Sequence, residues 1–119
     1  MSMARCSVLV AEDDDDLRES LSLVLRSEGF RTQAAANGQQ ALALCRAQRP
    51  DVVLLDLHMP VMDGYEFLRQ QSRDPQLAGV PVIGITGQPT EPLPSQVKAT
   101  LKKPFLVEEL LHLISRECR

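Results

Sequence analysis

Short segments of strand-like composition alternate along the chain with longer segments in which apolar residues recur at helical spacing. Three of the short segments are mostly apolar, at residues 6–11, 51–55 and 80–85, and two weaker ones lie at residues 30–34 and 99–101. Continuous apolar runs of this length are typical of β-strands that are covered on both faces. The pattern therefore predicts five short strands, most of them buried.

The segments between these strands predict helices with one apolar face each. A glycine ends the first helix, and an Asn-Gly pair opens the second. The apolar positions on the helix faces are Leu17, Leu21, Val24 and Leu25, then Ala41, Leu42 and Cys45, then Tyr65, Phe67 and Leu68, and finally Leu106, Leu110, Leu111 and Ile114. Strands and helices that alternate with short connections indicate an α/β fold, in which a doubly wound parallel sheet carries helices on both faces.

One connection departs from this alternation. Residues 87–97 contain Gly87, Pro89, Pro92 and Pro94, and each proline would obstruct the interior of a helix. We therefore predict that the fourth helix of the pattern is shortened to about one turn near residues 95–99, or is missing.

Length, composition and charge narrow the class of protein. The 119 residues suit a single domain, 1–119, with residues 1–2 left open as a remnant of cloning. The net charge of −3 argues against direct binding of nucleic acid by this chain. The chain has no apolar run long enough for a membrane span and no export signal, so we expect a cytoplasmic protein with no membrane partner.

The cysteines fit neither a disulfide framework nor a zinc site, because there are three of them, Cys6, Cys45 and Cys118, at wide spacing. We therefore expect three reduced thiols.

Polar side chains that could take part in binding or catalysis follow several of the predicted strands. Glu12 and Asp13 follow the first, Asp56 the third, Thr86 the fourth and Lys103 the fifth. The carboxyl ends of parallel strands share one edge of a sheet, so these groups are expected to meet in a shallow pocket. Two like charges 4 Å apart repel by roughly 4 kcal/mol at an effective dielectric of 20, and a Mg²⁺ or Mn²⁺ ion would relieve this repulsion. A hydroxyl and an ammonium beside such an ion suit a phosphoryl group.

Four motifs occur in an order that resembles the response-regulator receiver domains of two-component signalling, of the chemotaxis-regulator type. They are VLVAEDD at 8–14, VVLLDLHMPVMDG at 52–64, VPVIGIT at 80–86 and KKPF at 102–105. The resemblance covers nearly the whole chain. It implies a flavodoxin-like five-stranded sheet in the order 2-1-3-4-5.

The resemblance also implies a role for each matching residue. Asp56 resembles the phosphoacceptor. The implied ligands of Mg²⁺, with Mn²⁺ as an alternative ion, are Glu12, Asp13, Asp56 and the main-chain carbonyl of His58. The implied phosphoryl contacts are Thr86 and Lys103, the loop-shaping residues are Pro60 and Gly64, and the residues expected to tune hydrolysis are His58 and Gln88.

The function implied by this resemblance is a signalling switch and not a turnover enzyme. Asp56 would accept a phosphoryl group from a histidine kinase or a histidine phosphotransfer protein, and the acyl phosphate would later hydrolyse. The family usually carries an aromatic residue three positions before the lysine, where this chain has Thr100. We expect a monomer that does not signal through the usual face around the fourth helix.

Three other classes remain open. A phosphatase or phosphotransferase of the haloacid-dehalogenase type would want a second acid two residues after the nucleophile, where this chain has His58. A binding module that works without phosphorylation is suggested by Thr100 and by the short fourth crossover. A flavin-binding protein of similar topology is a remote alternative, because no phosphate-binding loop follows the first strand.

Overall fold

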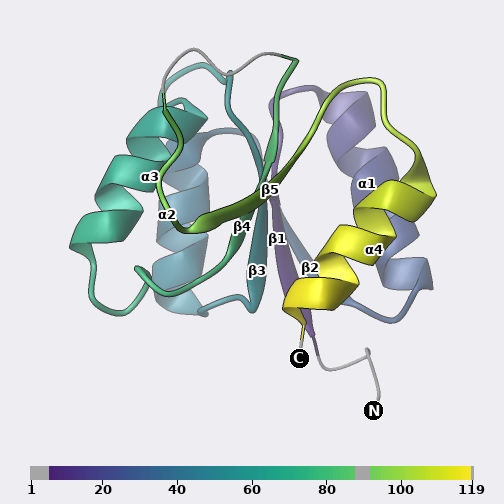
Figure 1. The fold of residues 1–119 in the computed structure, drawn as a ribbon, viewed down its shortest axis with the longest axis horizontal. Helices are drawn as coiled ribbons and strands as arrows, with labels where there is room; N and C mark the ends of the chain where they lie inside the picture. Colours follow the sequence, from purple (N-terminus) through teal and green to yellow (C-terminus); the bar gives the residue numbers. More distant parts are fainter. Residues whose placement is uncertain (1–5, 88–91, 119) are drawn as a thin grey trace.

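The computed structural model describes residues 6–87 and 92–118, which form a regular alternation of strands and helices (Figure 1). The strands are β1 (Ser7–Ala11), β2 (Arg31–Ala35), β3 (Val52–Asp56), β4 (Val82–Ile85) and β5 (Val97–Leu101). The helices are α1 (Asp15–Ser27), α2 (Gly38–Ala47), α3 (Gly64–Arg73) and α4 (Val107–Glu117).

The five strands form one parallel sheet in the order β2-β1-β3-β4-β5, which confirms the predicted flavodoxin-like topology. Figure 1 shows three layers, with α1 and α4 on one side of the sheet and α2 and α3 on the other. All strands run in the same direction, so their carboxyl ends lie along a single edge. This edge collects the residues that follow each strand.

Two apolar clusters separate the sheet from its two helical layers. One joins α2 and α3 to the sheet through residues such as Leu42, Phe67 and Leu68, and the other joins α1 and α4 through Leu25 and Leu110. β3 lies in the middle of the sheet and is buried along its whole length. The apolar runs seen in the sequence are therefore explained by burial of the central strands on both faces.

Local side chains set the beginning of three helices. The carboxylates of Asp14 and Asp63 and the side-chain oxygen of Asn37 each accept a hydrogen bond from a backbone N–H in the first turn. Such caps satisfy donors that have no partner within the helix. Gly29 ends the α1 turn at a φ of 94°, a conformation that suits glycine.

The connection between β4 and β5 has no helix among its described residues. Residues 92–94 belong to neither a helix nor a strand, Ser95 and Gln96 form a turn, and β5 follows at once. The predicted loss of the fourth crossover helix is therefore confirmed for residues 92–96. Pro89 lies outside the described residues.

A buried amide pair fastens this connection to α3. The Gln96 side chain donates to the Leu68 carbonyl at 3.1 Å, and the Gln71 side chain donates to the carbonyls of Leu77 and Val80 at 3.0 and 2.9 Å. Both glutamines are buried. Their amides thus satisfy backbone carbonyls of α3 and of the connection between α3 and β4.

The expectation of three reduced thiols is wrong for two of the cysteines. Cys6 and Cys118 form a disulfide, with their Cα atoms 5.8 Å apart, and Cys45 is the free thiol. The pair is separated by 112 residues, so only the fold brings it together, at the end of the molecule where both termini lie in Figure 1. Burial raises the pKa of Cys45 to about 12, which leaves that thiol protonated at neutral pH.

Among the residues that the structure covers, no helix combines the length and the apolar character needed to cross a membrane.

Candidate functional site

The carboxyl edge of the sheet positions the predicted polar residues through backbone hydrogen bonds just beyond the strands. The Glu12 N–H donates to the Ala35 carbonyl at 3.0 Å, and the Thr86 N–H donates to the Leu101 carbonyl at 2.9 Å. Both bonds continue the ladder of the sheet past the end of a strand. Glu12 and Thr86 are therefore placed as firmly as strand residues.

These residues line a shared pocket of 290 Å³ at this edge. Its lining consists of Glu12, Asp13, Asp14, Asp56, His58, Ile85, Thr86, Gly87 and Lys103. The structure thus brings together all five side chains that the strand-end pattern selected. Gln88 lies outside the described residues.

Three carboxylates in the pocket form a compact acidic cluster. One oxygen each from Glu12, Asp13 and Asp56 lies within 4.8 Å of the other two. Glu12 and Asp56 are buried, with relative exposures of 0% and 4%, whereas Asp13 is exposed. Two of the acids are therefore shielded from water, while the third faces solvent.

Lys103 is the cation that faces this cluster. Its Nζ lies 3.2 Å from Glu12 Oε1 and 3.4 Å from Asp56 Oδ2. Burial alone would lower the pKa of this ammonium, but its close contact with the Glu12 carboxylate and the charge of Asp56 outweigh the effect of burial and raise the pKa. Lys103 is therefore positively charged at neutral pH.

The carboxyl group of Glu12 is only partly satisfied. Its Oε2 accepts a hydrogen bond from the Asp14 N–H at 3.0 Å, but its Oε1 accepts none, although the Lys103 ammonium lies close to it. Burial, opposed by the Asp14 N–H and reinforced by Asp56, raises the pKa of Glu12 from 4.5 to about 7. Glu12 Oε1 is a buried acceptor that a further positive charge would satisfy.

The donor set fits a hard divalent cation. Glu12, Asp13 and Asp56 offer only oxygen atoms, and one of these oxygens accepts no hydrogen bond. Mg²⁺ favours oxygen ligands and is commonly bound through one or two carboxylates together with water and phosphate oxygens. One cation faces three acids in this pocket, so an added Mg²⁺ would reduce their mutual repulsion.

Asp56 is oriented by the loop that follows it. Its Oδ1 accepts a hydrogen bond from the His58 N–H at 2.9 Å. The His58 ring in turn lies beside Thr86, with 3.5 Å between His58 Nε2 and Thr86 Oγ1. Asp56 and Thr86 thus border the same pocket from adjacent strands, as expected.

The loop after Asp56 contains a strained turn that the sequence did not reveal. The Met62 N–H donates to the Pro60 carbonyl at 2.8 Å, which closes a γ-turn around Val61. Val61 has a φ of 69° and is 78% exposed. A positive φ is unfavourable for a β-branched residue, so the turn is strained at this position.

Gly64 shapes the same loop, but for a reason other than the one expected. The resemblance suggested that this glycine supplies an unusual backbone conformation, whereas its φ is not among the positive ones. A Cβ at Gly64 would lie 2.6 Å from Leu57 Cα and 2.8 Å from the Asp56 carbonyl oxygen. Gly64 allows α3 to begin directly against the backbone that carries Asp56.

The acidic run after β1 has two separate uses. Glu12 and Asp13 belong to the acidic cluster, whereas Asp14, which also lines the pocket, caps α1, and Asp15 and Asp16 lie in the first turn of that helix. Negative charges at the N-terminus of a helix interact favourably with the helix dipole.

One supporting residue escaped the sequence reasoning. The Arg18 guanidinium donates to the Glu12 carbonyl at 2.9 Å and so fixes the acidic loop from α1. No pattern in the sequence distinguishes Arg18 from an ordinary exposed arginine.

A family comparison agrees with this geometry. The model of the response regulator receiver domain matches residues 8–115. The DNA-binding response regulator MtrA of Mycolicibacterium smegmatis is 37% identical over 124 residues, which cover 100% of this chain and 53% of MtrA. The transcriptional regulatory protein AfsQ1 of Streptomyces coelicolor is 43% identical over 82 residues, which cover 69% of this chain and 35% of AfsQ1. The chain spans about half the length of the MtrA proteins that it matches.

Solved structures give the same result. The receiver domain of the sensor histidine kinase PA1611 from Pseudomonas aeruginosa superimposes with a TM-score of 0.85 at 28% identity, covering 95% of this chain and 97% of that one. That structure holds a magnesium ion coordinated in its active-site cleft. The chemotaxis response regulator CheY4 of Vibrio cholerae superimposes with a TM-score of 0.83 at 32% identity, covering 94% of this chain and 98% of that one.

The fold and the acidic pocket together define a receiver domain of the kind used in signalling. The chain belongs to the response regulator receiver domain family of two-component systems.

Proposed function

We propose that this chain is a phosphorylatable switch in which Asp56 is the phosphoacceptor. The observation that carries the proposal is the position of this buried carboxylate, which lies beside the Lys103 ammonium and clusters with the acidic pair Glu12 and Asp13. One of its oxygens is also fixed by the His58 N–H. A carboxylate held in this way is oriented for in-line attack.

The proposed donor is a phosphohistidine on a histidine kinase or on a histidine phosphotransfer protein. A carboxylate oxygen of Asp56 attacks the phosphorus atom and forms an O–P bond, while the N–P bond to the donor imidazole breaks. The imidazole retains the electron pair of that bond. Water later attacks the same phosphorus, which returns the carboxylate and releases inorganic phosphate.

Mg²⁺ is the proposed cofactor, and its ligands would be the carboxylates of Glu12, Asp13 and Asp56 together with the His58 carbonyl. When bound, the ion would offset the negative charge of the phosphoryl oxygens. The oxygen donor set and the magnesium ion in the PA1611 receiver domain support this assignment. The oxygen donor set would also suit Mn²⁺, but none of the relatives described above supports that alternative, and the ion in the PA1611 receiver domain favours Mg²⁺.

The remaining pocket residues have proposed roles that follow from their positions. Lys103 would pair with one phosphoryl oxygen, and the Thr86 hydroxyl would turn toward another. Pro60 and Gly64 hold the loop that carries the His58 carbonyl. The side chains of His58 and Gln88 are proposed to tune the hydrolysis of the acyl phosphate.

A hollow of 310 Å³ beside the pocket supports docking of a protein donor. It lies between α1 and the start of α4, it is largely apolar, and Lys103 borders both it and the acidic pocket. Close by, Leu106 and Val107 expose 66% and 42% of their surfaces. An apolar helix face of the phosphohistidine protein would cover these side chains and bring its imidazole toward Asp56.

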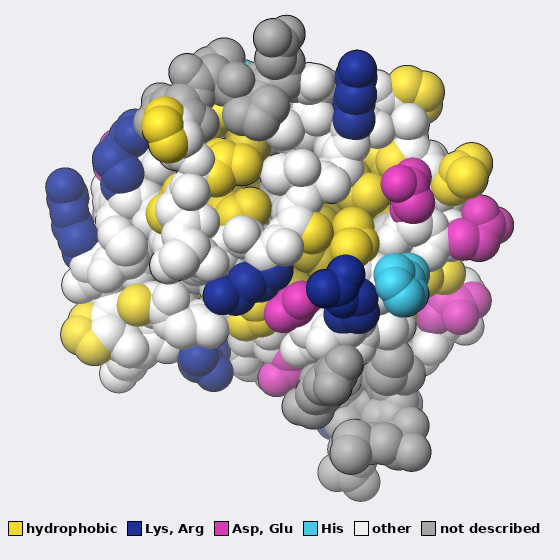
Figure 2. Space-filling model, in the orientation of Figure 1, with side chains coloured by type: hydrophobic (Ala, Val, Ile, Leu, Met, Phe, Trp, Pro, Cys, Tyr) yellow, Lys and Arg dark blue, Asp and Glu magenta, His cyan; other side chains and the backbone are white. Residues whose placement is uncertain are grey.

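Other partners and properties are inferred from charge and family. On the face drawn in Figure 2, the Lys and Arg side chains are scattered and do not form one continuous patch, and acidic side chains lie toward the right and near the centre. This mixture agrees with the proposal that the chain itself does not bind nucleic acid. We further infer one domain over residues 1–119, acting as a monomer in the cytoplasm.

Phosphoryl uptake tests the proposal directly. Incubation with acetyl phosphate and Mg²⁺ should add the mass of one phosphoryl group, as measured by intact-protein mass spectrometry. Asp56→Asn should show no gain. Asp16→Asn is the matched control, because Asp16 is exposed in the first turn of α1 and outside the pocket lining, and it should gain the group as the wild type does.

Two results would contradict the proposal. One is a wild-type protein that gains no phosphoryl group, which would favour a binding module that works without phosphorylation. The other is an equal gain in Asp56→Asn. Sustained turnover of a phosphoester by the isolated chain would instead favour the phosphatase class.

A further inference from the structure

Three side chains connect the acidic pocket with a groove on the other side of α3. His58 Nε2 lies 3.5 Å from the Thr86 hydroxyl oxygen, and the His58 ring lies edge-on to the Tyr65 ring with 6.0 Å between their centroids. Tyr65 is in the first turn of α3 and is 5% exposed. Thr86, His58 and Tyr65 thus form a continuous contact from the strand end to the helix.

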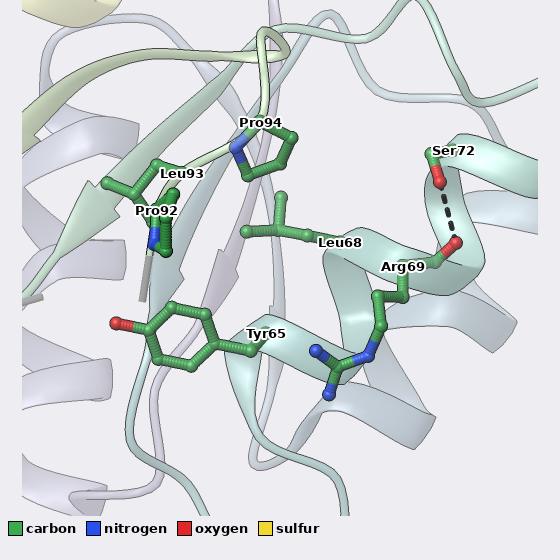
Figure 3. Close-up of a pocket in the computed structure, with 7 residues that line it drawn as sticks. All are labelled: Tyr65, Leu68, Arg69, Ser72, Pro92, Leu93 and Pro94. Carbon is green, nitrogen blue, oxygen red and sulfur yellow. Dashed lines mark hydrogen bonds between the residues drawn. The ribbon is translucent and has the colours of Figure 1, made fainter. Parts of the chain in front are cut away.

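The far side of Tyr65 faces a groove of 380 Å³. Figure 3 shows the Tyr65 ring opposite Pro92 and Leu93, with Leu68 and Pro94 deeper along the same groove. One wall is therefore α3, and the other is formed by residues 92–94 of the connection between β4 and β5.

The second wall of this groove is attached to α3 near its far end. The Gln96 amide donates to the Leu68 carbonyl at 3.1 Å and reaches Gln71 Oε1 at 3.4 Å. This attachment fixes the segment at residue 96, whereas residues 92–94 line the groove together with Tyr65. A movement of the Tyr65 ring would therefore change the shape of the groove beside residues 92–94.

This chain lacks the aromatic residue that the receiver family usually carries three positions before the lysine. Thr100 stands where an aromatic residue is usual, and its side chain is exposed. No helix follows β4 among the described residues 92–96. A signal at Thr86 therefore needs another route to the surface.

We propose that His58 and Tyr65 form this route and transmit phosphorylation to the groove between α3 and residues 92–94. The inference rests on the proposed function, since it requires a phosphoryl group on Asp56. When the Thr86 hydroxyl turns toward that group, it leaves His58 Nε2. The His58 ring then repacks against Tyr65, and the groove changes shape.

The composition of the chain provides a selective probe. Tyr65 is the single tyrosine and the chain has no tryptophan, so tyrosine emission reports on this one ring. The emission, and its quenching by acrylamide, would be recorded before and after treatment with acetyl phosphate and Mg²⁺. Phosphoryl occupancy is measured by mass spectrometry on the same samples.

We expect a shift in emission and quenching in the phosphorylated wild type and no shift in Asp56→Asn. Thr100→Val is the matched control and should keep the shift, whereas His58→Ala and His58→Gln should lose it at equal phosphoryl occupancy. A phosphorylated wild type with unchanged Tyr65 emission would overturn the inference but leave the proposed function intact. A shift that survives in a phosphorylated His58 variant, or that disappears in Thr100→Val, would overturn it as well. A wild type without phosphoryl uptake would instead refute the proposed function.

Discussion

The two edges of the sheet differ in what they contribute to the protein. The carboxyl edge holds three acids around one lysine, a glutamic acid with a pKa raised to about 7, and a valine at positive φ. The opposite edge holds the Cys6–Cys118 disulfide and, among the residues described, no second group of acids, histidines and cysteines that could hold a metal ion. The reactive edge is thus less stable than it could be, and the fold is reinforced at the distant edge instead.

The disulfide gives the largest expected effect. A crosslink that closes a loop of roughly 100 residues stabilises a protein by about 4–5 kcal/mol in the chain-entropy model. Reduction should therefore lower the thermal midpoint of the wild type substantially. Cys118→Ser should start at the lowered midpoint and not respond to reductant, whereas Cys45→Ala should keep the response. Titration of three free thiols in the unreduced, unfolded wild type would contradict the disulfide.

Close packing at the reactive edge gives the next effect. Gly64→Ala would force a methyl group against the backbone of Leu57 and Asp56, and we expect a loss of about 2–3 kcal/mol in the free energy of unfolding. Gly87→Ala is the control, because a Cβ at Gly87 would meet no atom of the described residues within 4 Å. Urea denaturation of both variants measures the difference. Equal stabilities would show that the loop can move away from α3.

The buried acid makes stability depend on pH in an unusual direction. The folded-state pKa of Glu12, about 7, lies above its ordinary 4.5, so the folded state holds this proton more tightly than the unfolded state. The stability that the folded state gains by holding this proton is fully present below pH 4.5. As the pH rises to 7, the free energy of unfolding falls by roughly 3 kcal/mol. The difference in unfolding free energy between wild type and Glu12→Gln should follow this course when Mg²⁺ is absent.

Added Mg²⁺ should act in the opposite sense. Its binding requires ionised Glu12, so it should raise the thermal midpoint more at pH 7.5 than at pH 5. The Glu12→Gln variant should lose most of that difference. A wild type that Mg²⁺ stabilises equally at both pH values would contradict the role of Glu12.

The strained turn gives the smallest effect. Val61→Gly should stabilise the protein by about 1 kcal/mol, because glycine adopts a φ of 69° without steric cost. Val61→Ala keeps a Cβ and removes only exposed apolar surface, so it should recover little of this gain. Comparison of the two by urea denaturation separates backbone strain from the loss of the side chain.

The repeating layout of the fold could be predicted because it depends on local patterns. The apolar runs of β1, β3 and β4 gave their positions, and the Asn37 and Gly29 signals gave helix ends. The prolines likewise predicted the lack of a helix in the part of the connection between β4 and β5 that the structure describes. The acidic pocket was predictable once the sheet was taken to be parallel, since one edge must then collect every strand end.

Other features had no local signal. Cys6 and Cys118 are far apart in sequence, and nothing in their spacing indicated that they form a pair. Val61 looked like an ordinary loop residue, and its positive φ arises from the turn that its neighbours close. Arg18 and Gln96 gained their roles only from the backbone carbonyls that the fold places beside them.

The order of residues by itself determined the alternation of elements, the parallel sheet and the identity of the acids, hydroxyl and lysine at its edge. Only the tertiary structure decided how deeply Glu12 is buried, which cysteines pair and which contacts connect Thr86 with Tyr65. The physical reason is the distance along the chain over which each interaction acts. Periodicity and capping act within a few residues, whereas desolvation, crosslinking and side-chain contact depend on groups that the chain brings together from distant positions.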